Sequence, residues 1–297
     1  MIDVVECPIC SNTDLQKFTR CEDYTVSHET FHVKQCSVCT LAITTPRPET
    51  SKLSDYYQSD EYISHSGKSS GGVGFIYKLA RSFSLKWKRA KVLRHKTEGS
   101  ILDFGCGTGE FLNTMKNSGW GITGVEPSPE ARLKAEILNS TKIGGSLGEL
   151  SNEQFDVITA WHVIEHVPDL IQTVQKLKSL LKKDGTIIIA VPNYQSPDAA
   201  SYQEHWAGFD VPRHLWHFSK KSMSTLFTST GLKLIDIIPM KLDAYYVSML
   251  SEKYKNENTI DLSCLMKGFI SGLKSNFLAR RKINYSSLIY VAKANEV

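Results

Sequence analysis

The chain has 297 residues, of which 41% are hydrophobic and 22% charged, and 35 Lys and Arg against 31 Asp and Glu leave a net charge of +4. This composition is typical of a globular protein and excludes disordered, collagen-like and coiled-coil proteins. Apolar runs fall short of the roughly 18 residues that a membrane span needs, and the N-terminus lacks the layout of a signal peptide. We therefore expect a cytoplasmic protein without membrane segments, and the small net charge does not by itself indicate nucleic-acid binding.

Four of the seven cysteines form two C-x-x-C pairs, Cys7 with Cys10 and Cys36 with Cys39. Two such pairs supply the four thiolates of a tetrahedral Zn²⁺ site, and a site closed by four protein ligands is structural. The alternative, a redox-active C-x-x-C motif, needs a βαβ context that this region lacks. The pattern predicts a zinc ribbon over residues 1–46.

A linker with N-terminal helices is expected over residues 47–98. Its glycine- and serine-rich stretch at 66–72 contains G-K-S without the spacing of a P-loop, which favours a lid or linker. Apolar residues recur at helical spacing from Phe75 to Lys96, and the opposite face of this predicted helix carries only basic charges. That face is either an ordinary solvated surface or a phosphate-contacting one.

The stretch Gly99–Leu112 contains the pattern G-x-G-x-G at Gly105, Gly107 and Gly109, between a short apolar strand and the start of a helix. Glycines at such a turn allow the backbone to approach a ligand closely. The pattern lacks the third glycine of the dinucleotide fingerprint, and Glu110 at that place repels a pyrophosphate at the helix N-terminus. A ligand with a small zwitterionic head and no phosphate fits better.

An acidic residue, Glu126, ends the next expected strand, 21 residues after Gly105. A carboxylate at this place accepts hydrogen bonds from the two hydroxyls of a ribose. With Asp103 two residues before the first glycine, the combined pattern becomes specific for a nucleoside-containing ligand.

These motifs resemble the cofactor-binding region of class I S-adenosylmethionine-dependent methyltransferases, and the similarity covers roughly Ser100–Ile238 with a final strand at Ser287–Ala292. The resemblance implies an α/β domain over 99–297 with a seven-stranded, Rossmann-like sheet whose last strand is antiparallel. It implies S-adenosyl-L-methionine as the cofactor. The cofactor-binding residues that it implies are Asp103, Gly105, Gly107, Gly109, Glu126, Pro127, Ser146, Leu147, Ala160 and Trp161.

The run from His162 to His166 spells H-x-x-E-H, a metalloprotease signature. That chemistry needs both histidines on one continuous helix, but Pro168 follows closely and the run comes directly after an expected strand. An equivalent run is common after the fourth strand of the resembled methyltransferases. We interpret His166 as orienting the loop, and His162 as a candidate that approaches the substrate.

A loop rich in histidine and aromatic residues, 205–219, follows the expected fifth strand. Because open α/β sheets bind ligands beyond the carboxyl ends of their strands, this loop is expected to face the reacting methyl group. Histidine has the unperturbed pKa best suited to proton abstraction near neutrality, so His214 is the candidate general base. The alternative is that Ser219 merely caps a helix and the aromatic residues pack beneath it.

The ribbon, the methyltransferase core and the element R-H-L-x-x-F-S at 213–219 together resemble the deoxysugar C-methyltransferases. That resemblance implies His214 as the base, assisted by an upstream tyrosine, for which Tyr62, Tyr56 and Tyr57 are candidates. The sequence departs from the family pattern in having Asp-Val-Pro-Arg directly before His214.

Residues 241–285 form a helical insertion before the last strand, which we interpret as a substrate lid or a dimer contact. The combined prediction is methyl transfer to a small-molecule acceptor, with a nucleotide-linked sugar as one candidate, by a monomer or homodimer that uses no membrane. One alternative is an RNA methyltransferase that holds RNA through the ribbon and the basic helix. The other is a non-catalytic protein that binds the cofactor.

Overall fold

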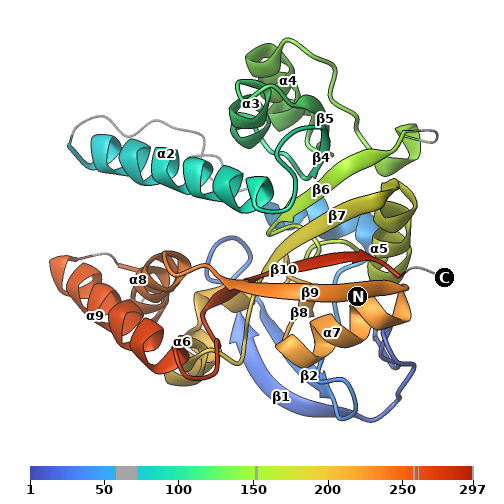
Figure 1. Ribbon diagram of the computed structural model, residues 1–297. Coiled ribbons are helices and arrows are strands. Elements are labelled where there is room, and N and C mark those ends of the chain that lie inside the picture. The colour runs from blue at the N-terminus through green and yellow to red at the C-terminus, as the bar shows by residue number, and fades with distance from the viewer. Residues whose placement is uncertain (58–71, 151–152, 257, 260, 296–297) are drawn as a thin grey trace.

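The structure is a computed structural model that describes residues 1–57, 72–150, 153–256, 258–259 and 261–295. The described residues form two β-sheets with covering helices, and a helix pair that projects from one side (Figure 1). Tyr62 and nearly all of the glycine- and serine-rich stretch at 66–72 lie outside the described residues.

The larger sheet contains six strands. In spatial order they are β5 (Gly121–Val125), β4 (Ser100–Phe104), β6 (Phe155–Trp161), β7 (Leu181–Pro192), β10 (Ser287–Ala294) and β9 (Leu232–Pro239). The first four are parallel to one another, whereas β10 is antiparallel to both neighbours. The expected antiparallel last strand is therefore confirmed.

The segment before Ser146, expected as a further strand, meets the sheet at one residue only. Gly144 forms a single parallel bridge to Val125, with one hydrogen bond to Gly124 and one from Glu126, each 2.9 Å long. Neighbouring glycines have low β propensity, which accounts for the missing strand. The described sheet thus has six strands where the sequence predicted seven.

Apolar side chains alternate between the two faces of the larger sheet, as the two-residue period of a strand requires. In β4, Leu102 joins the core cluster on one face and Ile101 joins the cluster on the other. The Leu102 side is covered by α5 (Leu170–Ser179) and α7 (Lys220–Ser229). The Ile101 side is covered by α2 (Gly72–Leu93) and α3 (Glu110–Lys116), and α4 (Pro129–Asn139) packs beside α3. Burial on both faces explains the unbroken apolar run in β7.

The smaller sheet joins the N-terminal segment to the histidine-rich loop. Its strands are β1 (Leu15–Glu22), β2 (Thr30–Cys36), β3 (Ala42–Thr44) and β8 (Trp216–His217), in that order and all antiparallel. Across the last pair, Ala42 lies opposite His217 and Ile43 opposite Trp216. The shorter helices are η1 (Thr50–Tyr57), η2 (Leu147–Glu149), α6 (Pro197–Tyr202), η3 (Gln203–His205) and η4 (Ala207–Phe209).

The insertion folds as two helices, α8 (Asp243–Lys255) and α9 (Leu262–Ala279), packed closely together (Figure 1). A Cβ atom at Gly268 would lie 2.6 Å from the Cα of Met249, and one at Gly272 would lie 2.8 Å from the Cα of Tyr245. Only glycine permits this approach at these two positions. Among the described residues, no helix combines the length and the apolar character required to cross a membrane.

Candidate functional site

The glycine loop connects β4 to α3 in a conformation that requires glycine. Gly105, Gly107 and Gly109 have φ angles of +71°, +55° and +83°, in the left-handed region that other residues rarely adopt. A Cβ atom at Gly105 would also lie 2.5 Å from the side chain of Val163. At Gly107, by contrast, a Cβ atom would meet nothing within 4 Å, so the loop is open to a ligand there.

Glu126 lies beside this opening, at the end of β5. One carboxylate oxygen accepts a hydrogen bond from the backbone N–H of Gly107 and the other accepts one from Ser128, both at 2.9 Å. Each oxygen has two lone pairs, so these contacts fix the carboxylate and leave acceptor capacity for two further donors. A ribose diol matches that requirement.

Asp103, at the end of β4, is buried and accepts a 2.6 Å hydrogen bond from the hydroxyl of Thr159. Burial raises the pKa of Asp103 to about 7, against the opposing effect of that hydrogen bond. A nearby positive charge favours the ionised carboxylate. The ammonium and sulfonium groups of S-adenosylmethionine carry such charges.

The remaining predicted cofactor residues lie at the same edge of the sheet. Pro127 follows Glu126, and Ser146 and Leu147 begin η2 just after the bridge to β5. Ala160 pairs with the end of β4, and the buried indole N–H of Trp161 has no partner among the described residues. Strand order reverses between β4 and β6, the place where ligands bind in open α/β sheets. These residues therefore fit an S-adenosylmethionine site.

His162 follows Trp161 and lies between two carboxylates. Its Nε2 is 3.1 Å from Asp243 and its Nδ1 is 3.4 Å from Glu165. Burial opposes protonation, but the hydrogen bonds to Asp243 and Glu165 outweigh it and raise the pKa of His162 to about 9. The side chain is thus an imidazolium near neutrality, so it is unsuited to the role of general base. Its φ of +57° also interrupts any helix through H-x-x-E-H, against the metalloprotease alternative.

Three residues in this region were missed by the sequence analysis. Asp243 is the first residue of α8, Glu165 is buried in the turn after β6, and Lys88 of α2 lies 4.7 Å above the ring of Trp161. Glu165 carried a signal, as the acidic residue of H-x-x-E-H. Asp243 and Lys88 carried no sequence signal, because only the packing of α8 and α2 brings them next to His162 and Trp161.

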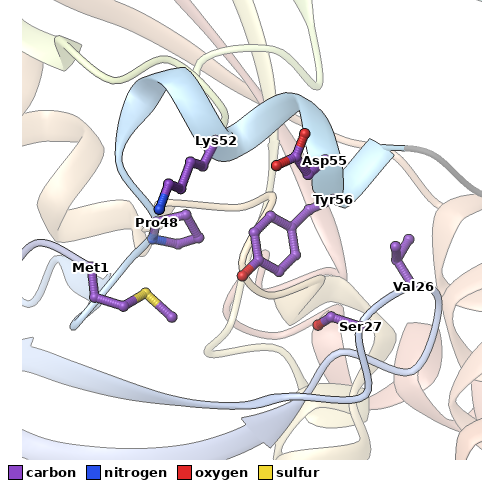
Figure 2. Close-up of a pocket in the computed structure, with 7 residues that line it drawn as sticks. All are labelled: Met1, Val26, Ser27, Pro48, Lys52, Asp55 and Tyr56. Carbon is purple, nitrogen blue, oxygen red and sulfur yellow. The ribbon is translucent and has the colours of Figure 1, made fainter.

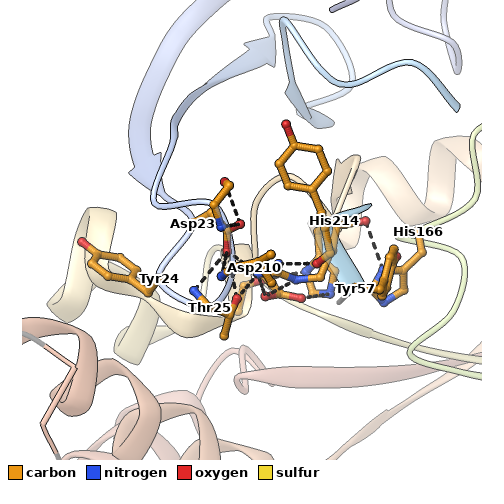
Figure 3. A network of polar contacts seen from close by, with 12 residues as sticks. Asp23, Tyr24, Thr25, Tyr57, His166, Asp210 and His214 are labelled. Atoms are coloured by element: carbon orange, nitrogen blue, oxygen red, sulfur yellow. Dashed lines mark hydrogen bonds and ion pairs between the residues drawn. The ribbon is translucent and has the colours of Figure 1, made fainter. Parts of the chain in front are cut away.

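The candidate base His214 lies in a cluster with His166 and Tyr57 (Figure 3). The two imidazole centroids are 4.6 Å apart. His214 Nδ1 is 3.0 Å from the carbonyl of Gly208, and His166 Nδ1 is 3.1 Å from the carbonyl of Arg213 and 3.0 Å from the Tyr57 hydroxyl. Because a carbonyl only accepts, each Nδ1 is the donor, and the neutral ring keeps its lone pair on Nε2. We call these three side chains the histidine–tyrosine cluster.

The cluster borders a charged and buried environment. Burial, followed by the charge of His214, lowers the pKa of His166 to about 4, so this ring is neutral. Asp210 lies 3.9 Å from Nε2 of His214. Glu165 is 0% exposed, and its Oε1 lies 3.4 Å from Nδ1 of His162. Together, Glu165, His166 and His214 offer three ligand atoms within 4.8 Å of one another, which is compact enough for a divalent cation.

The side chain of Arg213 connects the N-terminal segment to the histidine-rich loop. Its guanidinium donates to Asp23 at 2.9 Å, to Asp210 at 2.7 Å and to the backbone carbonyl of Tyr56 at 2.9 Å. Burial raises the pKa of Asp23, but the hydrogen bond and charge of Arg213 outweigh it and hold that pKa at about 2. Arg213 is 2% exposed and its donors are engaged within the chain, so it is not available to bind a substrate phosphate.

His217 connects the same loop to the smaller sheet. The hydroxyl of Thr44 donates to the carbonyl of His214 at 2.7 Å, and its oxygen lies 2.9 Å from Nε2 of His217. A hydroxyl has one proton to donate, so His217 is the donor in the second contact. Burial lowers the pKa of His217 well below its usual value, and the ring is a neutral structural link.

The four N-terminal cysteines form one cluster. Their sulfur atoms all lie within 4.8 Å of one another, with 3.4 Å between Cys7 and Cys39 and 3.5 Å between Cys10 and Cys36. All four are free thiols. Tetrahedral zinc–thiolate geometry places sulfurs about 3.8 Å apart, so the cluster fits a Zn²⁺ ion.

A cavity of about 370 Å³ is lined by N-terminal residues, none of which belongs to the glycine loop (Figure 2). Its lining residues are Met1, Val26, Ser27, Pro48, Lys52, Asp55 and Tyr56. Three basic side chains of α2 on the face that the sequence suggested as a phosphate surface contact the chain itself. Besides Lys88, Arg89 donates to Ser118 at 2.6 Å and Lys91 lies over the ring of Trp87.

Comparison with known proteins agrees with this geometry. Residues 78–237 match a family model described as a methyltransferase domain. A ubiquinone biosynthesis O-methyltransferase from Actinobacillus pleuropneumoniae is 32% identical over 123 residues, covering 35% of this chain and 52% of that protein. A protein of the same name from Pseudomonas paraeruginosa is 25% identical over 185 residues, covering 57% and 77%. The chain spans about half the length of the first of these curated relatives.

Two solved structures share the fold. A Galdieria sulphuraria protein described as a sarcosine dimethylglycine methyltransferase gives a TM-score of 0.52 at 16% identity, over 74% of this chain and 89% of that one. A complex of the Haloferax volcanii Trm112 methyltransferase activator with a methyltransferase gives 0.51 at 17% identity, over 70% and 89%. At such identities the likeness shows the fold alone.

Proposed function

The chain belongs to the methyltransferase-domain family, and on that premise we propose that it transfers a methyl group from S-adenosylmethionine to a small-molecule acceptor, with His214 as general base. One observation carries the proposal. The hydrogen bond between Nδ1 of His214 and the carbonyl of Gly208 makes Nδ1 the donor, so the ring that acts as base carries its lone pair on Nε2.

In this proposal the glycine loop and Glu126 hold the nucleoside, with Asp103 close to the positive charges of the cofactor. When bound, S-adenosylmethionine supplies an electrophilic methyl group on a sulfonium. His214 removes the proton of the acceptor as the acceptor's electron pair attacks that methyl carbon. The carboxylate of Asp210, 3.9 Å away, stabilises the imidazolium that His214 becomes.

Tyr57 is our choice among the candidates for the assisting tyrosine. Its hydroxyl lies 3.0 Å from His166, whose ring packs against His214. We assign Tyr57 and His166 to positioning of the base, since the His166 ring is neutral. Of the other two candidates, Tyr56 donates its hydroxyl to Glu29 at 2.7 Å, and Tyr62 lies outside the described residues and stays a prediction.

The acceptor that these features favour carries an ionisable hydroxyl. The curated relatives are named as O-methyltransferases of ubiquinone biosynthesis, which supports a phenol. A nucleotide-linked sugar, suggested by the likeness to deoxysugar C-methyltransferases, is less favoured because the donors of Arg213 are engaged within the chain. We also propose that the protein is located in the cytoplasm.

We also propose a structural Zn²⁺ ion held by Cys7, Cys10, Cys36 and Cys39, which fits the spacing of their sulfurs. The division into a ribbon at 1–46, a linker at 47–98 and a catalytic domain at 99–297 is retained as part of this proposal. The pairing of β8 with β3 means that the ribbon also supports the histidine-rich loop.

The test is methyl transfer from labelled S-adenosylmethionine to a panel of phenols, nucleotide-linked sugars and RNA. We expect His214→Ala to lower turnover on the active acceptor by about 10²–10⁴-fold, the range for loss of a general base, with unchanged cofactor affinity by calorimetry. His32→Ala, an exposed histidine of β2, is the matched control. Unchanged turnover of His214→Ala would overturn the assignment of the base.

Further measurements in the same assay distinguish this proposal from the alternative functions. Turnover that requires added Mg²⁺ or Mn²⁺ would reassign His166, His214 and Glu165 as metal ligands. Methylation of RNA alone, with binding that weakens steeply with salt, would favour the RNA methyltransferase. Cofactor binding without any product would indicate a non-catalytic protein.

A further inference from the structure

The outer face of α9 is a continuous apolar stripe. Its members lie at spacings of three, four or one along the helix and therefore share one face. They are each between 54% and 73% exposed: Leu262, Met266, Phe269, Ile270, Leu273 and Phe277. A contiguous exposed patch of this kind marks an interaction site more often than a chance feature of the surface.

The apolar stripe lies on the opposite side of α9 from the face that packs against the rest of the protein. The opposite face of α9 is buried through small residues, Gly268, Gly272 and Ser275 among them, and it packs directly on the backbone of α8. That inner face has no room for large side chains. The large apolar residues thus point outward because the close helix pair places them there, and Figure 1 shows α9 at the outer edge of the molecule.

The charged residues of the segment that contains α9 are all basic. Residues 262–282 carry five basic side chains and no acidic one: Lys267, Lys274, Arg280, Arg281 and Lys282. All five are exposed. An apolar face flanked by basic residues is the pattern of a helix that lies in the plane of an anionic lipid surface.

We propose that α9 docks this protein on an anionic phospholipid surface, with the apolar stripe in the headgroup region and the basic residues on the phosphates. A second copy of the chain is a poorer occupant. Pairing two α9 faces would bring five positive charges against five, with no carboxylate on either segment to offset them. This proposal does not depend on the identity of the methyl acceptor.

Docking also connects to the candidate site through α8. Asp243, the first residue of α8, is hydrogen-bonded to His162 at 3.1 Å. The α8–α9 pair is thereby attached to the end of β6, beside the proposed cofactor residues. A protein held by α9 would work at the lipid surface rather than in bulk solution.

The experiment is sedimentation of the full chain with vesicles of equal parts phosphatidylglycerol and phosphatidylcholine, and with phosphatidylcholine alone. We expect binding to the anionic vesicles, at least tenfold weaker binding to the neutral ones, and weakening with added salt. Met266→Glu with Ile270→Glu should reduce binding more than tenfold. Leu133→Glu with Ile137→Glu, two exposed apolar residues of α4, is the matched control and should bind as the unmodified protein does.

A charge variant provides a second test that leaves the stripe intact. Lys267→Glu with Lys274→Glu should weaken binding by about fivefold for each residue or more, because each lysine near the surface contributes on that scale. Absence of sedimentation with anionic vesicles, or equal loss in the α4 control, would overturn the proposal. So would a dimer by light scattering that Met266→Glu with Ile270→Glu converts to monomer without any vesicle binding, since that result assigns the stripe to a second copy.

Discussion

The cofactor edge of the larger sheet and the histidine–tyrosine cluster are built in different ways. At the cofactor edge, the contacts that fix the carboxylate of Glu126 lie within one segment, from Gly107 to Ser128, and backbone N–H groups make them. The cluster instead joins η1, the turn after β6 and the loop before β8, which are separated by up to 157 positions in the chain. The proposed ribose contact of Glu126 is thus prepared by residues close to it in the chain, whereas the proposed acceptor site exists only in the folded molecule.

We therefore expect substitutions in the two regions to affect different properties of the protein. Changes at the cofactor edge should affect ligand affinity and leave the fold intact. Changes around the cluster should affect the fold, because its residues also hold the ribbon against the catalytic core through Arg213 and β8.

The largest effect is expected from loss of the proposed Zn²⁺ ion. Structural zinc contributes on the order of 10 kcal/mol to folding in small modules. Cys36→Ser should therefore remove one zinc per chain, disorder the smaller sheet with β8, and abolish methyl transfer. Metal analysis and a turnover assay measure this, with Cys264→Ala, a buried cysteine outside the cluster, as control. Full zinc content in Cys36→Ser would contradict the proposed ligand set.

Replacement of Arg213 comes next. Arg213→Met leaves the buried carboxylate of Asp23 without its partner, and breaking a buried ion pair on one side costs about 3–5 kcal/mol. Urea unfolding should show this loss, whereas Arg20→Met on the exposed side of β1 should change stability by less than about 0.5 kcal/mol. A loss below about 1 kcal/mol for Arg213→Met would mean that the ribbon is held mainly by other contacts.

At the cofactor edge, Glu126→Gln should weaken S-adenosylmethionine binding by about ten- to a hundredfold, since hydrogen bonds to a charged group contribute about 1.5–3 kcal/mol. Its unfolding free energy should change little. Calorimetry measures the affinity, and Glu130→Gln, an exposed acid of α4, removes the same charge as a control. Equal affinities in the two variants would exclude a direct role of Glu126.

The smallest effect concerns pH. His162 has a folded-state pKa of about 9 against an ordinary value of 6.5, because its carboxylate partners outweigh burial. A raised pKa contributes stability that is complete below about pH 6.5 and is lost as the pH rises through about 9. We expect a loss of about 2 kcal/mol over that window, reduced from the full value by partial exposure of the ring. His162→Gln should flatten the dependence of unfolding free energy on pH. The NMR signal of His162 is the one that this variant lacks, and its titration below about pH 7 would refute the pairing with the two carboxylates.

Local patterns explain what was predictable. Glycine spacing, the acid that ends β5 and the two cysteine pairs each involve residues close in sequence, so the family and the cluster of four cysteines were predictable without coordinates. The missing strand at Gly144 was not predictable from the family pattern, since a single bridge replaces it. Nor was the pairing of Asp243 with His162, which joins residues 81 positions apart.

The sequence by itself determined the family and the grouping of the four cysteines, and it supplied the proposals for Glu126 and His214, because these depend on short-range spacing and on side-chain chemistry. Only the tertiary structure decided that Arg213 is a buried link, that His162 is charged, that Tyr57 reaches His166, and that α9 turns its apolar face outward. Each of those properties depends on which distant groups are brought within a few ångströms, and on how much water is left between them.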